Sequence, residues 1–198
     1  MKFTPRLERA VSVAARLHKS QTRRDKEATP YVTHLYSVML LVSSVAEDED
    51  TLIAALMHDS LEDVPGFSKE MLEEEFGGNV ANIVSHVTEP YIGGKDIPFQ
   101  KQWLLRKEAY LKNLQEGDTE SAIVSCADKL HNLSSFIRNY EEEGDEFLKR
   151  FHGSMKNQLE FYGLVLVILR EKLSADNTLL ARLESVYKEA QKLFENHA

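Results

Sequence analysis

The chain has little of what marks several large protein classes. It has one cysteine, Cys126, among 198 residues, which excludes an intramolecular disulfide framework and indicates a reducing compartment. Its longest apolar run covers residues 163–169, far short of the roughly 20 residues that a membrane-spanning helix requires. The N-terminal residues lack the apolar core of a signal peptide. We therefore expect a cytoplasmic protein with no membrane partner.

Basic residues are also scarce, because 24 lysines and arginines face 32 acidic residues and the net charge is -8. A nucleic-acid-binding domain usually presents a basic face or stripe, so we expect no nucleic-acid partner. A hydrophobic content of 42% excludes a disordered chain. The length suits one compact domain.

Only five prolines interrupt the chain, and the apolar residues between them recur at helical spacing. No stretch alternates with a period of two for long enough to predict a strand. Thr4 and Ser68 are expected N-caps. We predict an all-α fold of about eight helices in a single domain, residues 1–198. The expected helices cover residues 5–18, 31–45, 47–63, 68–87 (interrupted at Gly77-Gly78), 99–114, 120–140, 145–172 and 178–196.

The most informative segment is residues 58–63, His-Asp-Ser-Leu-Glu-Asp, which follows six apolar residues. On a continuous helix, His58 lies one turn from Glu62, and Asp59 lies one turn from Glu62 and Asp63. Carboxylates so close together at the end of a buried helix need a compensating charge. A divalent metal such as Mn²⁺ or Zn²⁺ suits imidazole and carboxylate ligands together. The alternative is a solvated helix end beside a partly buried histidine.

Two further segments add ligands of the same kinds. Residues 29–34, Thr-Pro-Tyr-Val-Thr-His, place His34 one turn after a proline-led helix start. Residues 126–132, Cys-Ala-Asp-Lys-Leu-His-Asn, place Asp128 on a helix whose first half is otherwise apolar. With His58 and Asp59, these segments supply two imidazoles and two carboxylates.

The order His, His-Asp, Asp resembles the HD-domain metal-dependent phosphohydrolases. More narrowly, six ordered blocks within about residues 5–140 resemble the hydrolase domain of RelA/SpoT proteins and the stand-alone small alarmone hydrolases. The blocks are residues 21–24, 29–34, 58–63, 75–77, 87–88 and 127–132. The resemblance implies hydrolysis of guanosine 3′,5′-bis(diphosphate)-type alarmones with release of the 3′-pyrophosphate. It also implies Mn²⁺ as the cofactor, although another divalent metal would suit the same ligands.

The same resemblance assigns the site residues position by position. It makes His34, His58, Asp59 and Asp128 the metal ligands. It gives Glu62 and Asp63 the catalytic role of handling the attacking water, without deciding which does what. It also implies that the small phosphorylated nucleotide contacts Arg23, Arg24, Tyr31 and Asn132.

The segment around Arg23 and Arg24 also carries an argument of its own. Residues 16–26 hold five basic residues and one acidic residue in a chain that is acidic overall. The planar guanidinium group of arginine suits bidentate contacts with phosphate. A solvated basic turn is the alternative.

The sequence departs from the family pattern at several positions. Leu35 follows His34 where the family usually has proline, and Ser134 and Ser135 stand where arginine and threonine are common. Ser134 cannot supply a cation, which favours an alternative: an HD phosphohydrolase acting on another small nucleotide or phosphorylated metabolite. A third alternative is a binding module without turnover, but the intact set of metal and catalytic residues argues against it.

Two helical segments carry weaker expectations. For residues 103–110 we expect a surface helix with Trp103 and Tyr110 packed inward, and the alternative is that Arg106 and Lys107 reach a substrate phosphate. Residues 141–198 are expected to form only C-terminal helices. The long apolar segment 145–172 leaves a homo-oligomer open.

Overall fold

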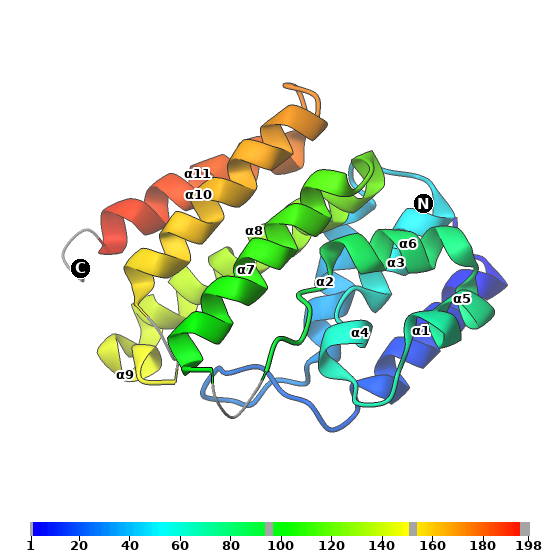
Figure 1. Cartoon of the computed structure of the whole chain (residues 1–198), viewed down its shortest axis with the longest axis horizontal. Coiled ribbons are helices and arrows are strands. Elements are labelled where there is room, and N and C mark those ends of the chain that lie inside the picture. The colour runs from blue at the N-terminus through cyan, green and yellow to red at the C-terminus, as the bar shows by residue number, and fades with distance from the viewer. Residues whose placement is uncertain (1, 94–96, 151–153, 195–198) are drawn as a thin grey trace.

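The computed structural model describes residues 2–93, 97–150 and 154–194 as a bundle of helices (Figure 1). Within these residues there is no strand, only an isolated antiparallel bridge between Thr22 and Pro30. The all-α prediction is confirmed. The helices are α1 (Pro5–Leu17), α2 (Val32–Val42), α3 (Glu49–Met57), α4 (Ser60–Asp63), α5 (Lys69–Phe76), α6 (Gly78–Val87), α7 (Phe99–Glu116), α8 (Thr119–Glu143), α9 (Asp145–Leu148), α10 (Met155–Lys172) and α11 (Thr178–Phe194).

Side-chain caps begin several of these helices where the sequence predicts them. Thr4 accepts a hydrogen bond from the backbone N–H of Leu7, and Ser68 accepts one from that of Met71. Each bond satisfies a backbone donor that the first helical turn leaves without a partner. The two predicted N-caps are therefore confirmed.

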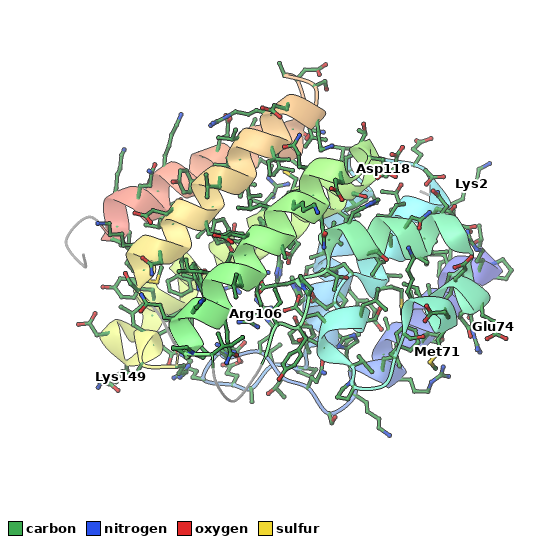
Figure 2. All side chains as sticks on the ribbon, viewed as in Figure 1. Lys2, Met71, Glu74, Arg106, Asp118 and Lys149 are labelled. Atoms are coloured by element: carbon green, nitrogen blue, oxygen red, sulfur yellow. The ribbon has the colours of Figure 1, made fainter. Side chains whose placement is uncertain are left out.

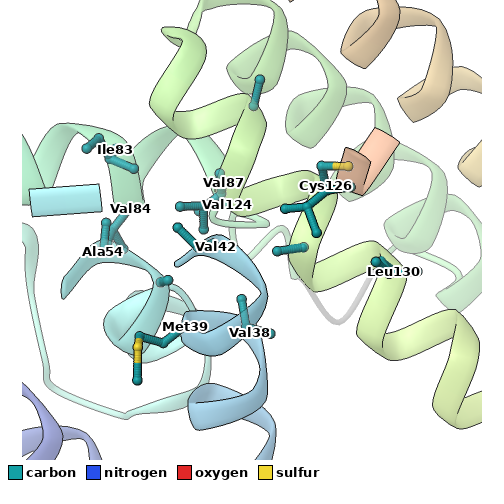
Figure 3. Packing of buried hydrophobic residues seen from close by; sticks show 14 of the residues in the cluster. Val38, Met39, Val42, Ala54, Ile83, Val84, Val87, Val124, Cys126 and Leu130 are labelled. Carbon is teal, nitrogen blue, oxygen red and sulfur yellow. The ribbon is translucent and has the colours of Figure 1, made fainter. Parts of the chain in front are cut away.

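Helix α3 lies at the centre of the bundle. All seven residues from Thr51 to Met57 are buried, and the helix packs against α1, α2, α6 and α8. Figure 3 shows part of this core, where apolar side chains of α2, α3, α6 and α8 meet. A helix that is buried on every side gives a rigid base to the residues that follow it, and those residues are His58 and Asp59.

The C-terminal helices form a second part of the bundle. Helices α10 and α11 pack against each other, and both contact α8, the longest helix (Figure 1). No helix in the described parts of the chain has the length and apolarity that a bilayer crossing requires.

The prediction of one helix over residues 145–172 is wrong. Helix α9 ends at Leu148, and α10 begins at Met155 with Ser154 as its N-cap. The Arg150 guanidinium binds the Glu143 carboxylate and the Arg24 carbonyl oxygen, so the chain after α9 is tied to α8 and to the α1–α2 loop. Phe151, which the expected stack of apolar residues included, lies outside the described residues.

Candidate active site

The segment His58-Asp59 occupies a break between two helices. Residues 47–63 were predicted as one helix, but α3 ends at Met57 and a separate turn, α4, starts at Ser60. In a continuous helix the carbonyl oxygen of Ala55 would accept a hydrogen bond from the backbone N–H of Asp59. Here that oxygen accepts from the ring Nδ1 of His58 at 2.8 Å. The break therefore sets the ring of His58 with its other nitrogen, Nε2, toward the neighbouring segments.

Three of the predicted metal ligands meet at this break. One ligand atom from each of His34, His58 and Asp59 lies within 4.8 Å of the other two. Asp128 joins them from α8, because its Oδ1 lies 3.2 Å from Nε2 of His34 and 3.5 Å from Nε2 of His58. The fold thus brings together side chains from α2, from the α3–α4 break and from α8.

The charges of the cluster fit a bound cation. Burial by itself would raise the pKa of Asp59 and Asp128. The imidazoles of His58 and His34 hold the pKa of Asp59 well below its ordinary value. The ammonium group of Lys129 and the same imidazoles do so for Asp128. Burial would conversely lower the pKa of His58, yet the charges of Asp59 and Asp128 raise it well above its ordinary value. The imidazoles and carboxylates together form the mixed nitrogen and oxygen donor set that divalent metals take.

The imidazole of His34 is fixed from its far side. Its Nδ1 lies 2.8 Å from Nδ1 of His131. Burial, together with the nearby charges of His34 and Arg23, lowers the pKa of His131 to about 4, so His131 is neutral at physiological pH. A hydrogen bond to the far ring nitrogen orients a ligating histidine, which makes His131 a support that the sequence interpretation did not assign.

Both carboxylates of the cluster are also held by other side chains. The hydroxyl group of Tyr31 donates to Oδ2 of Asp59 at 2.7 Å, and the ammonium group of Lys129 donates to Oδ2 of Asp128 at 2.6 Å. Burial and the charge of Asp59 raise the pKa of the Tyr31 phenol, which keeps it protonated as a donor. Tyr31, which was predicted to contact the nucleotide, therefore also contacts a candidate metal ligand.

The basic α1–α2 loop approaches the same cluster from another side. Its backbone is paired across its base, because the N–H of Arg23 binds the carbonyl oxygen of Thr29 and the N–H of Tyr31 binds that of Gln21. The guanidinium of Arg23 donates to Oδ1 of Asn132 at 2.9 Å, and Nδ2 of Asn132 donates to Oδ1 of Asp128 at 2.5 Å. The loop is thereby linked to a candidate metal ligand.

Many of these groups border one cavity of about 400 Å³, a size in the range of small-ligand sites. Of the ten site residues predicted from the sequence, the cavity wall includes all except His34 and His58. Those eight are Arg23, Arg24, Tyr31, Asp59, Glu62, Asp63, Asp128 and Asn132. The two histidines are buried beside Asp59.

Glu62 and Asp63 of α4 stand next to the cluster. Partial removal from water and the charges of Asp59, Glu89 and Asp63 raise the pKa of Glu62 to about 8. Burial and the charge of Asp59 also raise the pKa of Asp63. A carboxylate with a raised pKa can accept a proton near neutral pH, which is the property of a general base.

The structure also shows cavity residues outside the predicted set, among them Lys107, for which a contact with a substrate phosphate was the alternative expectation. Lys107 of α7 and Lys129 of α8 line the wall, as do Gln158, Phe161 and Tyr162 of α10. Lys129 directly follows Asp128 in a motif and could have been noted from its position alone. No sequence signal linked α10 to the site, because its apolar spacing is that of an ordinary core helix.

Ser134 and Ser135, two of the positions that depart from the family pattern, differ in their relation to the cavity. Ser135 lines the cavity, whereas Ser134 is not among the described residues of the wall. The prediction that Tyr110 packs inward is confirmed, since its side chain is 2% exposed. The expectation that residues 103–110 form only a surface helix is wrong for Lys107.

Comparisons with known proteins identify the family to which the chain belongs. The family model described as "HD domain" matches residues 10–150. The protein named guanosine-3′,5′-bis(diphosphate) 3′-pyrophosphohydrolase MESH1 from Xenopus tropicalis is 35% identical, over 65% of this chain and 68% of its own length. Its Drosophila melanogaster counterpart is 37% identical, over 61% of this chain and 63% of its own length. The bifunctional (p)ppGpp synthase/hydrolase SpoT from Escherichia coli is 33% identical, over 65% of this chain and 18% of its own length.

Solved structures agree with this result. The structure reported as "A metazoan ortholog of SpoT hydrolyzes ppGpp and plays a role in starvation responses" has a TM-score of 0.75 and 26% identity. It covers 96% of this chain and 97% of that one. A Listeria monocytogenes protein, lmo0812, has a TM-score of 0.65 at 21% identity, covers 81% of this chain and 97% of that one, and shares the fold. The chain therefore belongs to the HD-domain family, and within it is similar to the MESH1 and SpoT proteins.

Proposed function

We propose that this protein hydrolyses guanosine 3′,5′-bis(diphosphate)-type alarmones and releases the 3′-pyrophosphate, with Mn²⁺ as the bound metal. The observation that carries the proposal is the meeting of His34, His58, Asp59 and Asp128 beside a cavity that also holds Glu62 and Asp63. The names of the MESH1 and SpoT relatives support the choice of substrate.

In the proposed site, the two imidazoles and the two aspartates hold the metal. A bound divalent metal would polarise a phosphoryl oxygen and lower the pKa of water. Mn²⁺ accepts both nitrogen and carboxylate ligands, as Zn²⁺ also does, so the choice of Mn²⁺ needs a direct measurement.

The remaining groups of the site handle the proton and the substrate. Glu62, whose pKa is about 8, either takes the proton of the attacking water or orients that water. Asp63 carries out the other of these two tasks. Arg23 and Arg24 offer guanidinium groups to the phosphates from the α1–α2 loop. Asn132 and Tyr31, which contact Asp128 and Asp59, align those carboxylates and border the nucleotide.

Turnover of a substrate panel tests the proposal. Mn²⁺-loaded protein is incubated with guanosine 3′,5′-bis(diphosphate), GTP, a deoxynucleoside monophosphate and a generic phosphodiester, and the products are separated by ion-exchange chromatography. We expect GDP and pyrophosphate from the first compound. Cleavage of another nucleotide alone would support the alternative of a different small-nucleotide phosphohydrolase.

The cofactor and the cellular setting have separate tests. Rates with Mn²⁺, Zn²⁺, Mg²⁺ and Co²⁺ at matched free concentrations rank the metals, and we expect the highest rate with Mn²⁺.

The proposed cytoplasmic location is checked by fractionating cells that express the full chain. The proposed single domain is tested by an unfolding experiment described below.

A further inference from the structure

Lys107 is a cation on the cavity wall that the proposed chemistry does not use. It lies on α7, a different wall from the loop that carries Arg23 and Arg24, and its side chain is 19% exposed. Its ammonium group lies 4.5 Å from the centre of the Phe161 ring and 5.7 Å from that of Trp103. The ammonium group therefore lies close to two aromatic rings, on a side chain that lines the cavity.

The partner of Lys107 is the carboxylate of Glu89. Oε2 of Glu89 lies 2.5 Å from Nζ of Lys107, and Oε1 lies 3.3 Å from Nε of Arg106. Figure 2 shows Arg106 on α7. The backbone N–H of Glu89 separately donates to Oε2 of Glu62 at 3.2 Å. One carboxylate thus lies beside two cations, which leaves this group of three side chains with an excess positive charge.

Two other cations of the wall have partners within the proposed site. Lys129 binds Asp128, and Arg23 binds Asn132. The ion pair of Lys107 is instead with Glu89, which is neither a proposed metal ligand nor a proposed catalytic residue. This difference points to a separate role for the Lys107 and Glu89 pair.

One carboxylate compensates the burial of Lys107 only in part. Burial lowers the pKa of Lys107 in spite of the attraction of Glu89. A phosphate group carries more negative charge and more acceptor oxygens than a carboxylate, so it would stabilise the buried ammonium group better. Repulsion of the carboxylates of Glu62 and Glu89 would also decrease if Glu89 moved away from the site.

We propose that Lys107 is a second phosphate-binding subsite, in which a phosphate group of the nucleotide takes the place of the Glu89 carboxylate. The proposal rests on the proposed function and deepens it. It identifies the substrate class as a nucleotide with two phosphate-bearing arms, one at the His34, His58, Asp59 and Asp128 cluster and one at α7. The Glu89 carboxylate occupies the subsite until the second arm arrives.

The test measures equilibrium binding of the two reaction products, GDP and inorganic pyrophosphate, to the full Mn²⁺-loaded chain by isothermal titration calorimetry. Lys107→Met should weaken the binding of at least one product about tenfold or more, because a charge-assisted hydrogen bond is lost. Glu89→Gln should strengthen the binding of that same product several-fold. The glutamine keeps the backbone N–H that binds Glu62 and removes only the competing charge.

The opposite signs of the two effects separate a subsite from a structural ion pair. If the pair only stabilised the fold, both variants would weaken binding. Lys107→Arg should retain the affinity, and Lys112→Met, at an exposed position on the same helix, is the matched control. Unchanged binding in Lys107→Met, weaker or unchanged binding in Glu89→Gln, or no binding of either product by the unmodified protein would overturn the proposal.

A failure of the subsite can be distinguished from a failure of the proposed function. Turnover of guanosine 3′,5′-bis(diphosphate) by the unmodified protein decides the function, whereas product binding by the variants decides the subsite. A protein that releases no pyrophosphate but shows the two opposite binding effects would refute the function and keep the subsite. Normal turnover by the unmodified protein, with unchanged product binding in both variants, would support the function and refute the subsite.

Discussion

Asp128 uses its two carboxylate oxygens for different contacts. Oδ2 accepts from Lys129, while Oδ1 faces the two imidazoles and accepts from Asn132. A carboxylate held in this way cannot rotate without breaking charge-assisted hydrogen bonds, so its orientation is set before any ligand binds. Asp59 is held differently, because the hydroxyl group of Tyr31 donates to Oδ2, the same oxygen that faces the two imidazoles.

Replacing Asp59 by alanine should abolish metal binding. The substitution removes one of three groups whose ligand atoms lie within 4.8 Å. A metal that binds only the folded state stabilises it by about 2.7 kcal/mol at 100 times its dissociation constant, and this gain should vanish. Thermal melts with and without Mn²⁺, together with metal analysis after gel filtration, measure the effect. Asp176→Ala, at an exposed turn between α10 and α11, should keep the full metal-dependent shift.

Replacing Glu62 by glutamine should separate binding from turnover. Glutamine keeps the size of the side chain but cannot take a proton, and loss of a general base typically lowers the rate by about 10²–10⁴-fold. We expect kcat to fall in that range while the Mn²⁺ content stays at the level of the unmodified protein. A variant that retains full kcat would remove Glu62 from the mechanism.

The single thiol should be inert in the folded protein. Cys126 is fully buried, and burial with the nearby charge of Glu184 raises its pKa to about 12. The thiolate is the reactive form, so almost none is present at pH 8. A chromogenic disulfide reagent should leave the native chain unmodified and should titrate one thiol in denaturant. Rapid reaction in the native state would contradict this expectation.

At the scale of elements, the site depends on where helices end. Helix α3 stops at Met57 and α4 restarts at Ser60, which frees Asp59 to face both Tyr31 and His58. Gln21, in the α1–α2 loop, donates to the backbone carbonyl oxygen of Asp63 and so ties α4 to the basic loop. These joints determine the site more directly than the helices themselves do.

The joint between α5 and α6 offers a direct stability test. Gly77 has φ 88° and ψ 162°, a conformation that is essentially restricted to glycine. Gly77→Ala should lower the free energy of unfolding by about 1–3 kcal/mol through backbone strain alone, since an added Cβ has no atom within 4 Å. Urea unfolding followed by circular dichroism measures the change. Gly78→Ala is the matched control, because its Cβ would meet only the flexible Glu73 side chain at 3.4 Å.

At the scale of the whole molecule, the cavity depends on helices from both halves of the chain. Helix α10 contributes residues from Met155 to Tyr162 to a wall whose other residues lie between Thr22 and Phe147. Helix α11 covers α8, which carries Asp128 and Asn132. The C-terminal helices are therefore coupled to the site by packing, which supports the proposal of one domain.

If residues 1–198 form one domain, a defect in α10 should destabilise the entire chain. Leu166 is 1% exposed, and Leu166→Ala should cost about 2–5 kcal/mol because it leaves a cavity. We expect a lower midpoint in a single cooperative transition that circular dichroism and tryptophan fluorescence report together. Leu164→Ala, at a position 54% exposed, should shift the midpoint little. Two separated transitions would indicate two domains.

Much of this arrangement follows from local sequence patterns. The helical spacing of apolar residues predicts the all-α class, and the N-caps at Thr4 and Ser68 predict two helix starts. The motifs that contain His34, His58, Asp59 and Asp128 predict which side chains meet. Such features are found again in the structure because periodicity, capping and motif order are properties of short segments.

Other features depend on contacts between segments that are far apart in the sequence, and these only the tertiary structure decided. The use of Tyr31 to hold Asp59 depends on such a contact, and so does the position of the chain after α9, which Arg150 ties to the carbonyl oxygen of Arg24. The break after Met57 is accompanied by a local contact, between the His58 ring and the Ala55 carbonyl oxygen, that helical periodicity does not reveal. Lys107 shows the same limit, since its helical pattern is that of a surface residue while α8 and α10 place it on the cavity wall. The sequence by itself therefore determined the helices and the chemistry of the site. Packing decided which groups orient that chemistry, because the hydrogen bonds that hold these side chains join segments far apart in the sequence.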